Sequence, residues 1–78
     1  MNVDITIKAE EARRLKEDTA FQDFMQDVRD DQIRIFTTSG ATDIELREEA
    51  HAILRALEQL QSKLDAAIDA QTIASKLR

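Results

Sequence analysis

Apolar residues in the second half of the sequence recur at helical spacing. Their positions alternate in steps of four and three along the chain: Leu46, Ala50, Ile53, Leu57, Leu60, Leu64 and Ala67. This heptad seam is typical of an amphipathic helix, and Glu, Gln, Arg and Lys fill most of its other side. Just over three heptads suit a short coiled coil and one helix of a bundle equally well. We therefore predict a helix from residue 43 to about residue 70 or beyond.

Two shorter helices are predicted before this one. The apolar stripe of the first, over residues 19–36, consists of Phe21, Phe24, Met25, Val28, Ile35 and Phe36. A shorter helix over about residues 8–17 is marked by Ala9, Ala12 and Leu15. Residues 1–7 alternate between apolar and polar like a strand. Because a lone strand cannot form a sheet, we expect these residues to be an N-terminal arm.

Capping residues mark where these helices begin. Thr19 with Gln22 fits a capping box, and Asp18 is a second candidate N-cap for the same helix. Thr42 with Glu45 fits another capping box, at the start of the long helix.

The predicted loop, residues 37–42, contains the only glycine of the chain, Gly40. We expect Gly40 to end the preceding helix in a left-handed conformation, which glycine adopts without steric cost. A phosphate-binding loop would need more glycines and a lysine, so that function is not indicated.

These elements predict an all-α fold in a single small domain, residues 1–78. The short loop makes the last two helices antiparallel neighbours. The longer of the two then overhangs the other by roughly 15 Å. Because two helices alone enclose no interior, the N-terminal helix or another copy of the chain must cover their apolar stripes. We therefore expect an antiparallel helical hairpin with a short N-terminal helix, completed as a helical bundle by oligomerisation.

The candidate residues for self-association come from both apolar stripes. They are Phe24, Val28, Ile53, Leu57, Leu60 and Leu64. A homo-oligomer is the association that we expect these residues to make.

Composition narrows the possible partners. The chain has 78 residues, a net charge of −5 and no cysteine. An excess of acid disfavours direct contact with nucleic acid, because phosphates require clustered Lys and Arg. No apolar run approaches the roughly 20 residues of a membrane span, and we expect no membrane contact.

Aspartates are concentrated in the middle helix. Asp23, Asp27 and Asp30 repeat along one helical side, and Asp31 adjoins them. Three interpretations are open: a surface that binds a basic partner, a divalent-cation site, or a solvated side that keeps the protein soluble.

No arrangement of residues indicates catalysis. The only histidine, His51, has no second His and no Cys to share a metal ion with. Ser39 and Ser62 do not lie in a nucleophile motif. We predict a protein that is not an enzyme, with no catalytic, cofactor-binding or metal-binding residues.

Several short runs resemble a family of helical proteins encoded among the head and packaging genes of tailed bacteriophages. The runs are EEARRL at 10–15, DTAF at 18–21, IRIF at 33–36, DIELRE at 43–48 and the seam from Ile53 to Leu64. Members of that family often have Pro at the position of Thr19, and Trp at the positions of Phe36 and His51. The resemblance implies a phage gene neighbourhood but no defined activity and no catalytic residues.

Two functional hypotheses result. The first is a non-enzymatic helical interaction protein, a small phage virion-assembly or accessory protein that self-associates or binds a head, portal or packaging protein. The alternative is an acidic inhibitor or adaptor that binds a basic host protein through Asp23, Asp27, Asp30 and Asp31. Both place the chain in the cytoplasm of an infected bacterial host, and the first is also compatible with a place in the virion.

Overall fold

Three helices make up almost all of the chain. The structure is a computed structural model that describes residues 3–77, as α1 (Val3–Glu17), α2 (Thr19–Thr38) and α3 (Ile44–Lys76). No strand occurs between residues 3 and 77. The prediction of an all-α fold is therefore confirmed.

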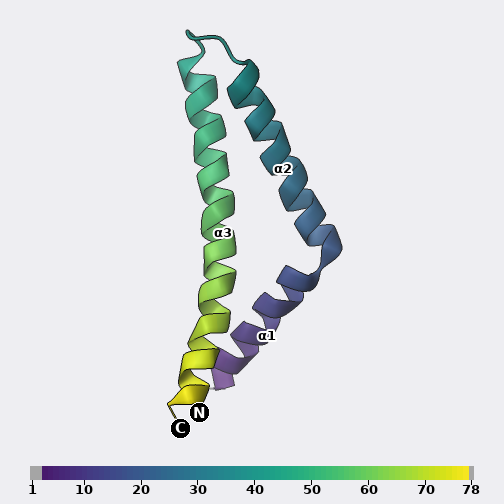
Figure 1. The fold of residues 1–78 in the computed structure, drawn as a ribbon, viewed down its shortest axis with the longest axis vertical. Helices are drawn as coiled ribbons and strands as arrows, with labels where there is room; N and C mark the ends of the chain where they lie inside the picture. The colour runs from purple at the N-terminus through teal and green to yellow at the C-terminus, as the bar shows by residue number, and fades with distance from the viewer. Residues whose placement is uncertain (1–2, 78) are drawn as a thin grey trace.

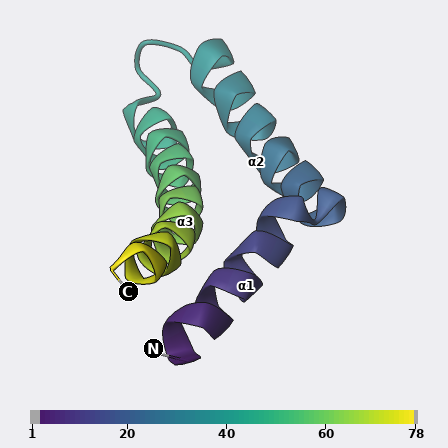
Figure 2. The same cartoon turned by 60° about the horizontal axis from the view of Figure 1, so that its bottom comes forward.

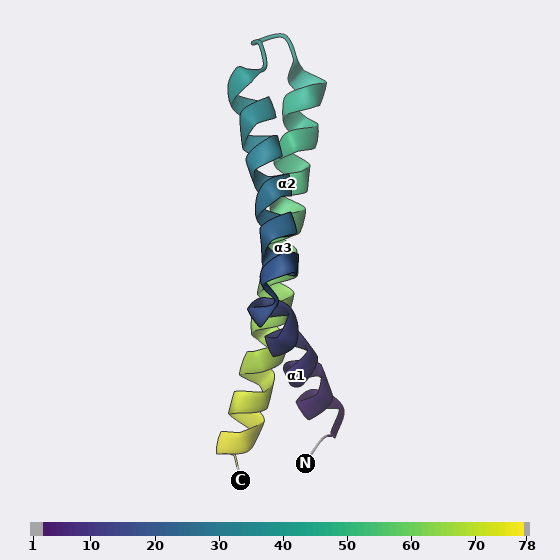
Figure 3. The same cartoon turned by 90° about the vertical axis from the view of Figure 1, so that its right-hand side faces the viewer.

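The long helix α3 is the spine of the molecule. Both α1 and α2 pack against it and run in the opposite direction, one after the other along its length (Figures 1 and 3). The molecule measures 56 × 23 × 15 Å. Because α1 and α2 follow one another along α3 instead of stacking over it, the three helices form one layer. The radius of gyration, 16.8 Å, accordingly exceeds the value of about 11.5 Å for a compact domain of this length.

The N-terminal arm predicted over residues 1–7 is wrong where the structure describes it. Helix α1 already begins at Val3, and residues 1 and 2 lie outside the described part. Asp4 lies in the first turn, where its negative charge complements the helix dipole. Ile5 is half-buried. Strand-like alternation therefore did not prevent a helix, because packing overrides the weak preference of β-branched residues for strands.

Asp18 separates α1 from α2 and turns the chain (Figure 2). Its backbone is extended (φ −76°, ψ 107°), and its Oδ1 accepts a hydrogen bond from the Phe21 backbone N–H at 3.0 Å. Asp18 is therefore the N-cap of α2. The capping box of Thr19 and Gln22 is wrong, because the Gln22 amide donates instead to the Leu15 carbonyl oxygen at 3.2 Å.

Replacing Asp18 by alanine is expected to lower the free energy of unfolding by about 1 kcal/mol, within a range of 0.5–2. The variant leaves the Phe21 N–H without its side-chain acceptor at the bend. Urea unfolding followed by circular dichroism measures the change. Thr19→Ala is the control, since Thr19 makes no cap, and an equal loss in both variants would contradict the assignment.

The loop between α2 and α3 differs from its prediction in two respects. Helix α2 ends at Thr38, and its C-cap is Ser39, whose N–H donates to the Ile35 carbonyl at 3.0 Å. Gly40 does not have a positive φ, so the left-handed C-cap is wrong. The N-cap of α3 is Asp43, so the capping box of Thr42 and Glu45 is also wrong. The Asp43 carboxylate accepts from the Gly40 N–H at 2.8 Å, which closes the loop and leaves α3 without a side-chain cap.

Among residues 4–77, the buried side chains are few and mostly small. They are Ala9, Ala12, Met25, Ala50 and Leu64. Most of the larger apolar side chains stay half-buried or exposed, because one layer of helices can enclose only the line along which the helices touch.

Candidate interaction surface

Two contacts establish how α2 lies against α3. The Gln61 amide donates to Gln22 Oε1 at 3.0 Å, and the Arg47 guanidinium carbon lies 4.8 Å from the centre of the Phe36 ring. Gln22 and Phe36 lie fourteen residues apart on α2. Arg47 and Gln61 lie equally far apart on α3, and this spacing is about four helical turns. Helices α2 and α3 therefore keep one antiparallel register between these two contacts. Both contacts lie on the same side of the line along which α2 touches α3. The sequence gives no signal for these pairs, because each joins residues far apart in the chain.

The opposite side of the helix pair contains several apolar side chains. Each residue advances about 100° around a helix, and Met25 in α2 and Ala50 in α3 mark the buried line. Counted from these positions, four of the six predicted self-association residues fall on the side away from the Gln22–Gln61 pair. This surface, called the Phe24 face below, consists of Phe24, Val28, Ile53 and Leu60.

Phe24 and Leu60 lie at the same height on this face, where height means position along the helix axes. Phe24 is close to Gln22 on α2, and Leu60 is close to its partner Gln61 on α3. Phe24 is 71% exposed, and Val28 and Leu60 are each 39% exposed. Ile53 is half-buried. A phenylalanine that stays in water while smaller residues are buried marks an uncovered surface of the single chain.

Two of the six predicted self-association residues lie elsewhere. Leu57 is half-buried on the line between the helices. Leu64 is buried, and with Ala12 and Leu15 it lines a shallow cavity between α1 and α3. The chain's own helix α1 therefore already occupies the place where another copy could touch Leu64.

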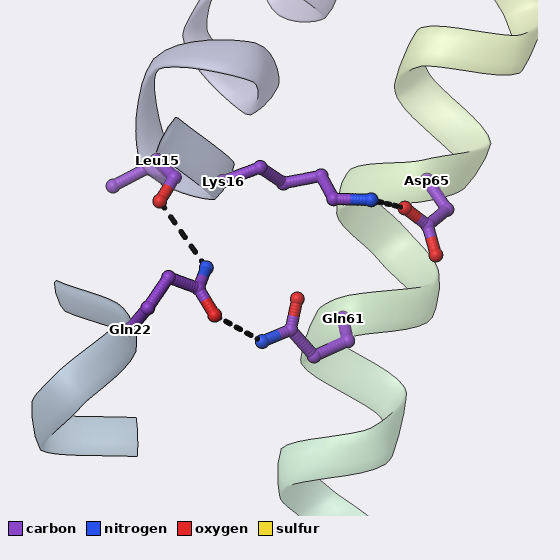
Figure 4. Close-up of polar contacts among 5 residues, drawn as sticks. All are labelled: Leu15, Lys16, Gln22, Gln61 and Asp65. Atoms are coloured by element: carbon purple, nitrogen blue, oxygen red, sulfur yellow. Dashed lines mark hydrogen bonds and ion pairs between the residues drawn. The ribbon is translucent and has the colours of Figure 1, made fainter. Parts of the chain in front are cut away.

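Polar side chains bridge the bend between α1 and α2 to α3 (Figure 4). Lys16 of α1 forms an ion pair with Asp65 of α3. Gln22 connects the Leu15 carbonyl to Gln61, since its Nε2 donates to that carbonyl and its Oε1 accepts from Gln61. The exposed ion pair contributes little stability, but together these contacts hold the bend at one height along α3.

The four aspartates that form the predicted acidic surface are all exposed. They project from the side of α2 that lies away from α3, as their helical positions require. Two of them have partners: Asp30 Oδ1 accepts from the Gln26 amide at 2.8 Å, and Asp31 forms an ion pair with Arg34. Asp23 and Asp27 complete the set. Binding of a basic protein by this surface stays a prediction.

His51 lies in a shallow depression near the loop. The depression is lined by Phe36, Ile44, Arg47, Glu48 and His51. No hydroxyl or thiol is among these side chains, so His51 has no nucleophile to activate there. Within the described part of the chain, no three His, Cys, Asp or Glu side chains come together as metal ligands would.

Comparisons with known proteins assign this chain to no family. No protein-family model matches it, and neither does any curated protein sequence or solved structure. Over residues 3–77, no helix has both the length and the apolar composition needed to cross a membrane.

Proposed function

We propose that this chain is a non-enzymatic helical interaction protein that acts by presenting the Phe24 face to another protein surface. The observation that carries the proposal is the exposure of Phe24, at 71%, beside other apolar residues on one side of a single layer of helices. An apolar side of this kind is stabilised when a partner excludes water from it.

In this proposal α2 and α3 form an antiparallel hairpin, and α1 closes the far end of α3. Partner helices that pack on the Phe24 face would complete a helical bundle. Bundles bury the apolar stripes that a helical pair leaves in water.

The setting that we propose is phage virion assembly, with the chain itself or a head, portal or packaging protein as the partner. This part of the proposal rests on the runs at 10–15, 18–21, 33–36 and 43–48 and on the seam from Ile53 to Leu64. The chain would then work in the cytoplasm of an infected bacterial host or within the virion.

Site-specific photocrosslinking tests whether the Phe24 face meets a protein. A photoreactive phenylalanine analogue at position 24 is expected to crosslink to a discrete protein during phage infection. The same analogue at position 26 is the control, because Gln26 is exposed on another side of α2. Crosslinking at position 24 that does not exceed that at position 26 would contradict the proposal.

A further inference from the structure

The exposed area of the single chain is larger than its mass requires. The chain exposes 5996 Å², whereas a compact monomer of 8.9 kDa exposes about 4,800 Å². The excess of about 1,200 Å² exceeds the roughly 800 Å² that each partner buries in a standard protein interface. Covering one side of the helical layer with one partner would therefore bring the exposed area of the chain close to that of a compact domain.

The Phe24 face is suited to contact with an identical face. Its four residues are apolar and come from both helices, and its largest residue, Phe24, lies at the height of Leu60 on α3. A two-fold axis parallel to the helices places α2 of each copy on α3 of the other at unchanged height. Phe24 then packs against Leu60 of the partner subunit, and the same contact occurs twice.

Charge favours this arrangement over one that places α2 against α2. Asp27 and Asp31 flank the Phe24 side of α2, so two adjacent copies of α2 would bring like charges together. The pairing of α2 with α3 places only one copy of this acidic flank of α2 at each contact.

We infer that the Phe24 face is the interface of a two-fold homodimer in which α2 of each copy packs on α3 of the other, forming a four-helix bundle. This inference rests on the proposed function and specifies its partner.

Sedimentation equilibrium of the purified full chain over a wide range of concentrations tests the inference. The wild-type chain is expected to have the mass of a dimer. Phe24→Asp is expected to raise the dimer dissociation constant by about 100-fold, because the charge enters the interface twice. Ile33→Asp is the matched control, since Ile33 is 45% exposed on another side of the same helix, and it should leave the dissociation constant unchanged.

Circular dichroism checks that both variants keep the helical content of the wild type. Phe24→Ala provides a milder variant, which should weaken the dimer without adding a charge. A wild-type chain that is monomeric at every concentration overturns the inference, and so does a dimer that is equally stable in the Phe24 and Ile33 variants. A monomeric chain that still crosslinks through position 24 to a different protein during infection would overturn the homodimer and leave the proposed function standing.

Disulfide trapping tests the arrangement of helices, and the absence of cysteine from the sequence makes it specific. Phe24→Cys and Leu60→Cys are prepared as separate proteins, mixed and oxidised. Disulfides between the two different variants are expected to exceed those between two copies of Phe24→Cys. Ile33→Cys is the control that should stay reduced. Preferential linkage of two copies of Phe24→Cys would overturn the pairing of α2 with α3.

Discussion

Replacing Leu64 by alanine is expected to lower the free energy of unfolding by about 2–5 kcal/mol. Leu64 is 8% exposed and is the only leucine among the buried residues of the described chain. It lines the contact of α1 with α3, where the small side chain of Ala12 provides little apolar area of its own. Because a domain of this size has a total stability of about 4–12 kcal/mol, the substitution removes a large share of it.

Thermal unfolding followed by circular dichroism at one protein concentration measures the effect. The expected fall in the melting temperature is on the order of 10–30 °C. Leu77→Ala is the matched control, since Leu77 is 81% exposed just beyond α3 and its loss should change the stability by less than about 0.5 kcal/mol. Equal melting temperatures for the two variants would show that Leu64 does not support the contact of α1 with α3.

Helical character was predictable from local pattern, whereas the residue that faces the partner helix was not. Phe24 and Met25 belong to the same predicted stripe but lie about 100° apart around the helix, so only one of them can point at α3. The structure buries Met25 and leaves Phe24 in water. That choice depends on the register between α2 and α3, which is set by contacts such as Gln22 with Gln61 between residues far apart in the sequence.

Cap geometry was predictable only in part, for a related reason. Several Ser, Thr and Asp residues near each helix start compete for the same backbone N–H groups. At the first break Asp18 caps the Phe21 N–H, and at the loop Asp43 turns back to Gly40. The residue types at both places were consistent with caps, but the choice among them follows from the path of the chain.

The candidate surface shows the same division between local and long-range information. Phe24, Val28, Ile53 and Leu60 stood out in the sequence as apolar residues at helical spacing. Their position together on one uncovered side follows from the antiparallel register. Leu64 belongs to the same apolar seam as Ile53 and Leu60, but α1 covers it. The bend at Asp18 directs α1 along the end of α3.

Replacing Ala9 by leucine is expected to release α1 from α3 while α2 and α3 stay paired. Ala9 is 0% exposed and Ala12, one turn further along, is 3% exposed, so the two helices approach each other over side chains of a single carbon. Three additional carbons at position 9 have no free space and would force α1 away, at a cost of about 1–3 kcal/mol.

Limited proteolysis with trypsin measures the release of α1, since Arg13 and Arg14 lie within α1. Cleavage there should become roughly 5-fold to 150-fold faster, because each 1.4 kcal/mol changes the open fraction about tenfold. The matched control is Ala52→Leu, an exposed site on α3 where the same enlargement should leave cleavage unchanged. Unchanged cleavage in the Ala9 variant would mean that α1 does not depend on this close approach to stay bound.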